Sequence, residues 1–196
     1  MVVACLAPLT SLAAASVTVD LATRYRPATH VGSGFTYGVT ERLPADDDLE
    51  RLVGALRPRM LTNPASSDPG TQQPGIPANA IKVAARVASL GTAVTVRLAD
   101  WFSGWYAFTS MSDWFSKIGT TIAAKKAAKL SNIYAYEIWN EPNGSWTNGG
   151  DTNAVPGGNK TLSWNDFWKQ SFVRIRQLDP SVKITGPSRS YMDPDF

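Results

Sequence analysis

The chain has 196 residues, 43% of them hydrophobic and 18% charged, which is the composition of a globular protein with a core of its own. Its formal net charge of +3 is scattered along the chain, and this argues against a nucleic-acid partner. His30 and Cys5 are the single histidine and the single cysteine. The sequence therefore predicts no metal site, no cofactor and no disulfide.

Residues 1–16 are small and apolar, and Ala13-Ala14-Ala15 is similar to a signal-peptidase site. The segment is too short to span a membrane as a helix, and no basic residue precedes Arg24. We expect a signal-peptide remnant and a secreted protein, the alternative being a hydrophobic N-terminal strand. Residues 17–196 are then expected to form one domain without a membrane segment.

The remaining chain alternates strand and helix patterns. Runs of β-branched and aromatic residues predict strands at 16–20, 35–39, 59–63, 93–98, from 133 to the stop at Pro142, and at 182–185. Helices are predicted from Pro44, over 78–90, from an N-cap at Ser112 towards Leu130, and over 163–178. The expected apolar stripes of the first two are Leu49, Leu52, Val53 and Leu56, and Ile81, Ala84, Ala85 and Ala88.

This alternation predicts an α/β fold with a parallel sheet, because helical connections of this length suit right-handed crossovers. Loops after strands are long and aromatic, whereas loops after helices are short, so function is expected at one end of the sheet. An open doubly wound sheet would give the same alternation. The absence of Gly-x-Gly-x-x-Gly and of a phosphate-binding loop from the sequence weakens a nucleotide-binding interpretation.

The most informative stretch is Tyr136-Glu-Ile-Trp-Asn-Glu-Pro-Asn143, where an amide and a carboxylate follow a hydrophobic strand. It resembles the Trp-Asn-Glu-Pro signature of the clan of retaining (β/α)8 glycoside hydrolases, and more loosely the β-xylosidase/α-iduronidase family, family 39. The resemblance implies the N-terminal part of a TIM barrel, of about five strands and preceded by a short β segment. It also implies that Glu141, after the fourth strand, is the general acid/base and that Asn140 binds the sugar 2-hydroxyl. Such chemistry needs a partly buried carboxyl close to a second carboxylate.

Period-two alternation puts Glu137, Trp139 and Glu141 on one strand face. A charge buried there requires a partner, and Arg59 or Arg97 on neighbouring strands are the candidates. Glu137 is thus expected to be structural. Aromatic and amide side chains near the motif are candidate substrate-binding residues, since rings can stack on sugar C–H faces: Trp101, Trp105, Tyr106, Asn143 and Trp146. Ordinary loop packing is the alternative for each ring.

In the clan the nucleophilic glutamate ends the seventh strand, and a whole barrel takes about 250 residues. We therefore expect an incomplete barrel that carries the acid/base but not the nucleophile and is inactive alone. Its partner would be an oligo- or polysaccharide, together with the rest of the barrel. Two alternatives are a non-catalytic carbohydrate-binding protein on the same barrel and an unrelated α/β enzyme that uses Glu141 alone.

Overall fold

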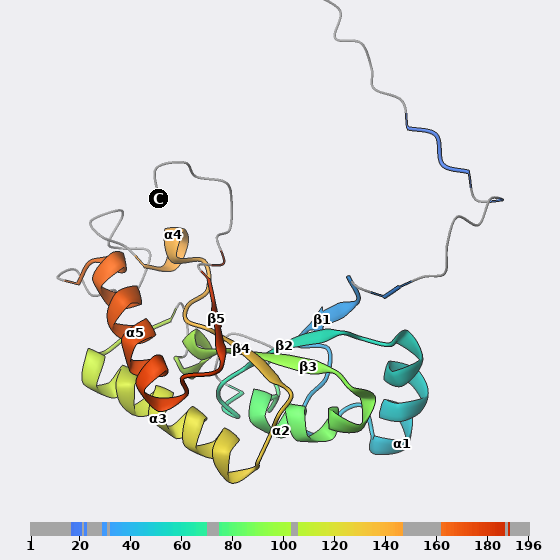
Figure 1. Cartoon of the computed structure of the whole chain (residues 1–196), viewed down its shortest axis with the longest axis horizontal. Helices are drawn as coiled ribbons and strands as arrows, with labels where there is room; N and C mark the ends of the chain where they lie inside the picture. Colours follow the sequence, from blue (N-terminus) through green and yellow to red (C-terminus); the bar gives the residue numbers. More distant parts are fainter. Residues whose placement is uncertain are drawn as a thin grey trace, which may run out of the picture.

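The computed structural model describes residues 17–20, 22, 29–30, 32–69, 75–102, 106–146, 162–186 and 188. Its centre is one five-stranded sheet with helices arrayed along one side (Figure 1). The strands are β1 (Gly34–Thr36), β2 (Met60–Pro64), β3 (Ala93–Arg97), β4 (Ile133–Glu137) and β5 (Lys183–Thr185). The expected signal-peptide remnant, residues 1–16, lies outside the described residues.

The order of the strands separates the two folds that the sequence left open. Each strand pairs with the one before it in the chain, in the order β1-β2-β3-β4-β5, and all four pairings are parallel. A doubly wound sheet would reverse its order at a switch point. Strands added one after another with helical crossovers are the arrangement of a (β/α)8 barrel. The structure is therefore the N-terminal, five-stranded part of such a barrel, as the sequence predicts.

Helices connect the strands. The first helical segment changes hydrogen-bonding pattern along its length, from α1 (Asp46–Asp48) through a π-helical turn η1 (Leu49–Val53) to a 3-10 turn η2 (Gly54–Leu56). The others are α2 (Ala80–Arg86), η3 (Ala88–Leu90), η4 (Leu98–Trp101), α3 (Met111–Ala127), α4 (Pro142–Ser145) and α5 (Trp164–Leu178). No helix of the described residues is long and apolar enough to cross a membrane.

The core lies between the sheet and these helices. Val94 and Val96 of β3 are fully buried, as is Leu61 of β2. Between α3 and α5 the core is aromatic, with Trp114 and Phe167 at a centroid distance of 5.4 Å. The indole Nε1 of Trp114 also donates to Ser171 Oγ of α5 (2.8 Å), so the two helices are joined by a satisfied buried polar contact.

Several local predictions were wrong. Residues 17–20 are exposed and form no strand. In the first helical segment Leu49 and Val53 are buried but Leu52 and Leu56 are exposed, because the π-helical turn rotates the apolar stripe. Helix α2 buries Ala80, Ile81, Val83 and Ala84, whereas the predicted Ala85 and Ala88 are exposed. The N-cap of α3 is Ser110, which accepts from Asp113 N, rather than Ser112.

Candidate active site at the strand ends

The Asn-Glu pair lies just beyond the carboxyl end of β4. Asn140 forms an isolated parallel bridge with Ser188, and the Glu141 backbone N–H donates to the Ser188 carbonyl at 2.7 Å. Pro142 then opens the one-turn helix α4, which also contains the half-buried Asn143. Asn140 is half-buried, but the Glu141 side chain is exposed and not partly buried as expected. Helix α4 follows it directly, beyond the end of the sheet (Figure 1).

Glu137 and Arg97 form a buried ion pair beneath this tip. The two residues are in register on β3 and β4, and Arg97 Nε donates to Glu137 Oε2 at 2.9 Å. The second carboxylate oxygen accepts from the Ser188 hydroxyl. Arg59, the other predicted partner, is exposed and precedes β2 at the opposite end of that strand, so it does not reach Glu137. Of the two predicted arginines, Arg97 is the partner, and both carboxylate oxygens of Glu137 are hydrogen-bonded.

A hydrogen-bonded chain runs from this ion pair to Asp100. Arg97 donates to the Tyr37 hydroxyl at 2.5 Å, and that hydroxyl donates to Asp100 Oδ2 at 2.9 Å. The Tyr106 hydroxyl lies close enough to Asp100 and Asn140 for both to influence its pKa. Side chains that follow β1, β3 and β4 therefore meet at one edge of the sheet, which is where parallel barrels carry their chemistry.

Asp100 is the most perturbed carboxyl of this chain of contacts. It is fully buried, and burial raises its pKa to about 7, against the attraction of Arg97 and the hydrogen bond from Tyr37. Arg97 is already paired with Glu137, so an ionised Asp100 would leave one buried negative charge in excess. Burial likewise raises the pKa of the Tyr37 and Tyr106 hydroxyls, with Asp100 as the next cause.

Three non-glycine residues at this edge have left-handed backbones. The φ values are 58° at Tyr37, 57° at Tyr106 and 49° at Glu141. Such conformations cost roughly 1 kcal/mol or more for residues with a Cβ, and they gather where the surrounding structure fixes a functional geometry. His30, Arg57 and Lys129 also have positive φ values, away from this edge, so left-handed backbone is not confined to it.

The aromatic residues near the motif mostly belong to the core. Trp146 is 6% exposed and stacks on Phe167 with centroids 4.1 Å apart, and Tyr106 is 3% exposed. Neither has a free face for a sugar, contrary to expectation. Trp101 is half-buried and donates its indole N–H to Thr121 Oγ1 at 2.8 Å; its role in sugar stacking stays a prediction. Trp105 lies outside the described residues.

The predicted shared face of Glu137 and Trp139 is wrong. Strand β4 ends at Glu137, so period-two alternation stops there. Trp139 is fully buried instead in the aromatic layer on the helix side, with centroid distances of 5.7 Å to Trp114 and 5.2 Å to Phe167. Its Nε1 donates to Ser145 Oγ of α4 (3.0 Å), which ties the chain after Glu141 back to the core.

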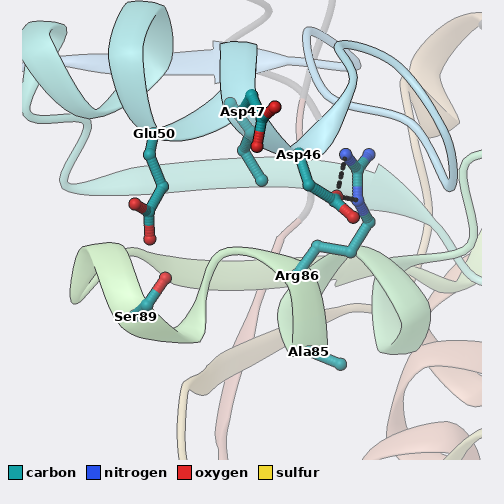
Figure 2. Close-up of a pocket in the computed structure, with 7 residues that line it drawn as sticks. Asp46, Asp47, Glu50, Ala85, Arg86 and Ser89 are labelled. Carbon is teal, nitrogen blue, oxygen red and sulfur yellow. Dashed lines mark hydrogen bonds and ion pairs between the residues drawn. The ribbon is translucent and has the colours of Figure 1, made fainter.

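A cavity of about 470 Å³ lies elsewhere, between the first helical segment and α2 (Figure 2). Figure 2 shows Asp46 and Arg86 paired across it, with an N–O distance of 2.9 Å, and Glu50 and Ser89 on the two sides of its other end. Both elements lie on the helix-covered side of the sheet, so this cavity is separate from Glu141.

Sequence reasoning missed Tyr37, Asp100 and Ser188. Each follows a strand closely: Tyr37 comes directly after β1, Asp100 lies within η4 after β3, and Ser188 follows β5. Polar residues just beyond the carboxyl ends of parallel strands converge, and this signal would have grouped them with Asn140.

No protein-family model and no curated protein matches the chain. Among solved structures, N2152 from Neocallimastix frontalis is similar to it, with 38% sequence identity and a TM-score of 0.72 over 86% of this chain. The chain spans 39% of the length of N2152. A psychrophilic glycoside hydrolase family 10 endo-beta-1,4-xylanase is 16% identical, with a TM-score of 0.46, over 77% of this chain and 51% of its own. The similarity to N2152 is close in both sequence and structure, whereas the similarity to the xylanase is too distant to support an argument.

Proposed function

We propose that this chain is the acid/base part of a retaining glycoside hydrolase, secreted and acting on an oligo- or polysaccharide. The observation that carries the proposal is the position of Asn140 and Glu141, beyond the carboxyl end of the fourth strand of a sequentially ordered parallel barrel sheet. A (β/α)8 enzyme carries its catalytic residues at that end. The hydrogen bonds around the site and the left-handed backbone at Glu141 support the proposal, because they fix the geometry of the chain there.

In this proposal Glu141 protonates the glycosidic oxygen and then, as a base, activates water, while Asn140 binds the sugar 2-hydroxyl. A second carboxylate about 5–5.5 Å from Glu141 would act as nucleophile. Glu137 is unsuited to that role, because it is 4% exposed and engaged by Arg97 and Ser188. The nucleophile would come from the seventh strand of the completed barrel, which would also cover the exposed Glu141.

The test uses the chain extended until it carries the whole barrel, assayed on aryl β-glycosides. Glu141→Ala should lose turnover of substrates with poor leaving groups and retain it for activated ones, because a good leaving group needs no acid. Added azide should restore part of the rate by attacking the glycosyl-enzyme intermediate without base help. Glu50→Ala, at an exposed glutamate of η1, is the matched control and should leave all rates unchanged.

Equal losses for good and poor leaving groups would contradict the role of Glu141. Sugar binding by the extended protein without any cleavage would favour the carbohydrate-binding alternative on the same barrel.

A further inference from the structure

Ser188 contacts both the buried ion pair and the Asn-Glu motif. Its hydroxyl donates to Glu137 Oε1, and its backbone carbonyl accepts from the Glu141 N–H at 2.7 Å. Asn140 also forms an isolated parallel bridge with it. Ser188 is half-buried and lies in the loop after β5. This loop therefore connects the carboxylate of Glu137 to the backbone of the residue proposed as the acid/base.

Glu137 is fixed firmly enough to hold Ser188 in place. Its side chain is buried, and its other oxygen, Oε2, accepts from Arg97 Nε at 2.9 Å. Arg97 in turn donates to the Tyr37 hydroxyl at 2.5 Å. A hydroxyl that donates to a carboxylate forms a charge-assisted hydrogen bond, which is roughly twice as strong as a bond between neutral groups. The Ser188 side chain is thus bound to a group that β3 and β4 hold together.

The Glu141 backbone adopts a conformation that needs support from its neighbours. It is left-handed, with φ 49° and ψ 54°, which costs roughly 1 kcal/mol or more for a residue with a Cβ. Its carbonyl oxygen accepts from Ser145 N and Ser145 Oγ, each at 2.8 Å, and its N–H is bonded to the Ser188 carbonyl. The carboxyl group itself is exposed and has no hydrogen bond within the described residues. Its direction therefore depends on the two backbone contacts.

We propose that Ser188 is a positioning residue for the general acid/base and that the Arg97–Glu137 pair holds it in place. The proposal rests on the proposed function and adds residues that act through Glu141 rather than on the substrate. The Ser188 hydroxyl fixes the loop after β5, and its carbonyl fixes the backbone that directs the Glu141 carboxyl group toward the glycosidic oxygen. Proton transfer needs donor and acceptor within hydrogen-bond reach, and a displacement of about 1 Å can cost roughly 100-fold in rate.

The experiment uses the whole-barrel protein and aryl β-glycosides with good and poor leaving groups. Ser188→Ala keeps the carbonyl acceptor but loses the hydroxyl. It should lower kcat/KM about tenfold for poor leaving groups, as for one hydrogen bond to a charged group, and change it little for good ones, which need no acid. Ser181→Ala is the matched control, because the Ser181 hydroxyl donates to the Asp179 carboxylate (3.5 Å) at the opposite end of β5. It should change neither rate.

A double-mutant comparison separates positioning from a general effect on the structure. It uses the glycoside with the poorest leaving group that Glu141→Ala still cleaves measurably. On that substrate Ser188→Ala should slow the parent but not the Glu141→Ala variant, because no carboxyl group is left to position. Three results would each overturn the proposal: equal losses of Ser188→Ala on good and poor leaving groups, no loss on either, or the same loss with and without Glu141.

If the whole-barrel protein hydrolyses no glycoside, the proposed function fails, and hydrogen exchange decides separately whether Ser188 holds the Glu141 backbone. The Glu141 N–H should exchange with solvent at least about tenfold faster in Ser188→Ala than in the parent, because the loop that carries its acceptor is no longer fixed. Ser181→Ala should not change this rate. Unchanged exchange in Ser188→Ala would overturn the positioning role by itself.

Discussion

Arg97 Nε and Glu137 Oε2 lie 2.9 Å apart at residues that face each other across β3 and β4. The pair links side chains from several loops, because Arg97 also donates to the Tyr37 hydroxyl and Glu137 also accepts from the Ser188 hydroxyl. Burying both charged groups costs desolvation free energy, so the pair adds little net stability. Removing one member is strongly destabilising, because the other charge stays buried without a partner.

Arg97→Met should lower the free energy of unfolding by about 3–5 kcal/mol, because it leaves the Glu137 carboxylate buried and unpaired. Urea denaturation measures this. The matched control is Arg51→Met: Arg51 pairs with Asp48 at 2.7 Å, but its side chain is 68% exposed, and such pairs contribute about 0–1 kcal/mol. Equal effects of the two substitutions would contradict the burial of the Arg97 pair.

Asp100 should make stability depend on pH. Its pKa is about 7 in the folded protein and near the ordinary 3.8 when unfolded, so the folded state holds the extra proton between these values. The contribution is fully present below about pH 4 and is lost as pH rises through 7, amounting to at most about 4 kcal/mol. Asp100→Asn removes the titration. The urea midpoint of Asp100→Asn minus that of the parent should be larger at pH 8 than at pH 4.5. A difference that does not change with pH would contradict the raised pKa.

Gly34 should not tolerate a side chain. A Cβ added there would lie 2.4 Å from the Met60 carbonyl oxygen of the neighbouring strand, which is backbone and cannot move aside without breaking the β1–β2 pairing. Gly34→Ala is expected to cost about 1–3 kcal/mol in a urea titration. Gly32→Ala is the control, since nothing lies within 4 Å of its added Cβ. Comparable stability of the two variants would mean that β1 does not pack as described.

Trp146 distinguishes a packing role from a sugar-binding role. Trp146→Ala should lower stability by about 3–5 kcal/mol, because the indole is 6% exposed and stacked on Phe167. Val173→Ala, at a 45% exposed position of α5, should change it by less than about 0.5 kcal/mol. A Trp146→Ala variant with parental stability but a raised KM for sugars would restore the stacking hypothesis.

The sequence was sufficient for the fold class because strands and helices of this length carry strong periodic signals. It also located the Asn-Glu pair beyond the fourth strand, although β4 ends at Glu137 and not at the predicted stop, Pro142. What it missed depends on tertiary geometry. The choice between Arg59 and Arg97 depends on which end of a strand each occupies, and Ser110 and Ser112 are equally good caps until the preceding loop is placed.

Trp139 and Asp100 show the same limit at the site. Alternation predicted the wrong face for Trp139, because β4 ends at Glu137 and the period-two pattern ends with it. Asp100 could not be recognised from its own segment, because its hydrogen-bond partner Tyr37 comes from the loop after β1. The order of the strands in the sheet decides which loops meet, and no single segment of the sequence shows that order.

The contact between Glu141 N and the Ser188 carbonyl also has a consequence for how the protein is made. Every strand pairs with the one synthesised just before it, so the sheet can grow while the chain is still leaving the ribosome. Glu141 emerges well before Ser188, and its left-handed backbone acquires its hydrogen-bond acceptor only after β5 has been added. The acid/base geometry is therefore a late product of synthesis, and a nascent chain that stops after β4 carries the motif without the conformation.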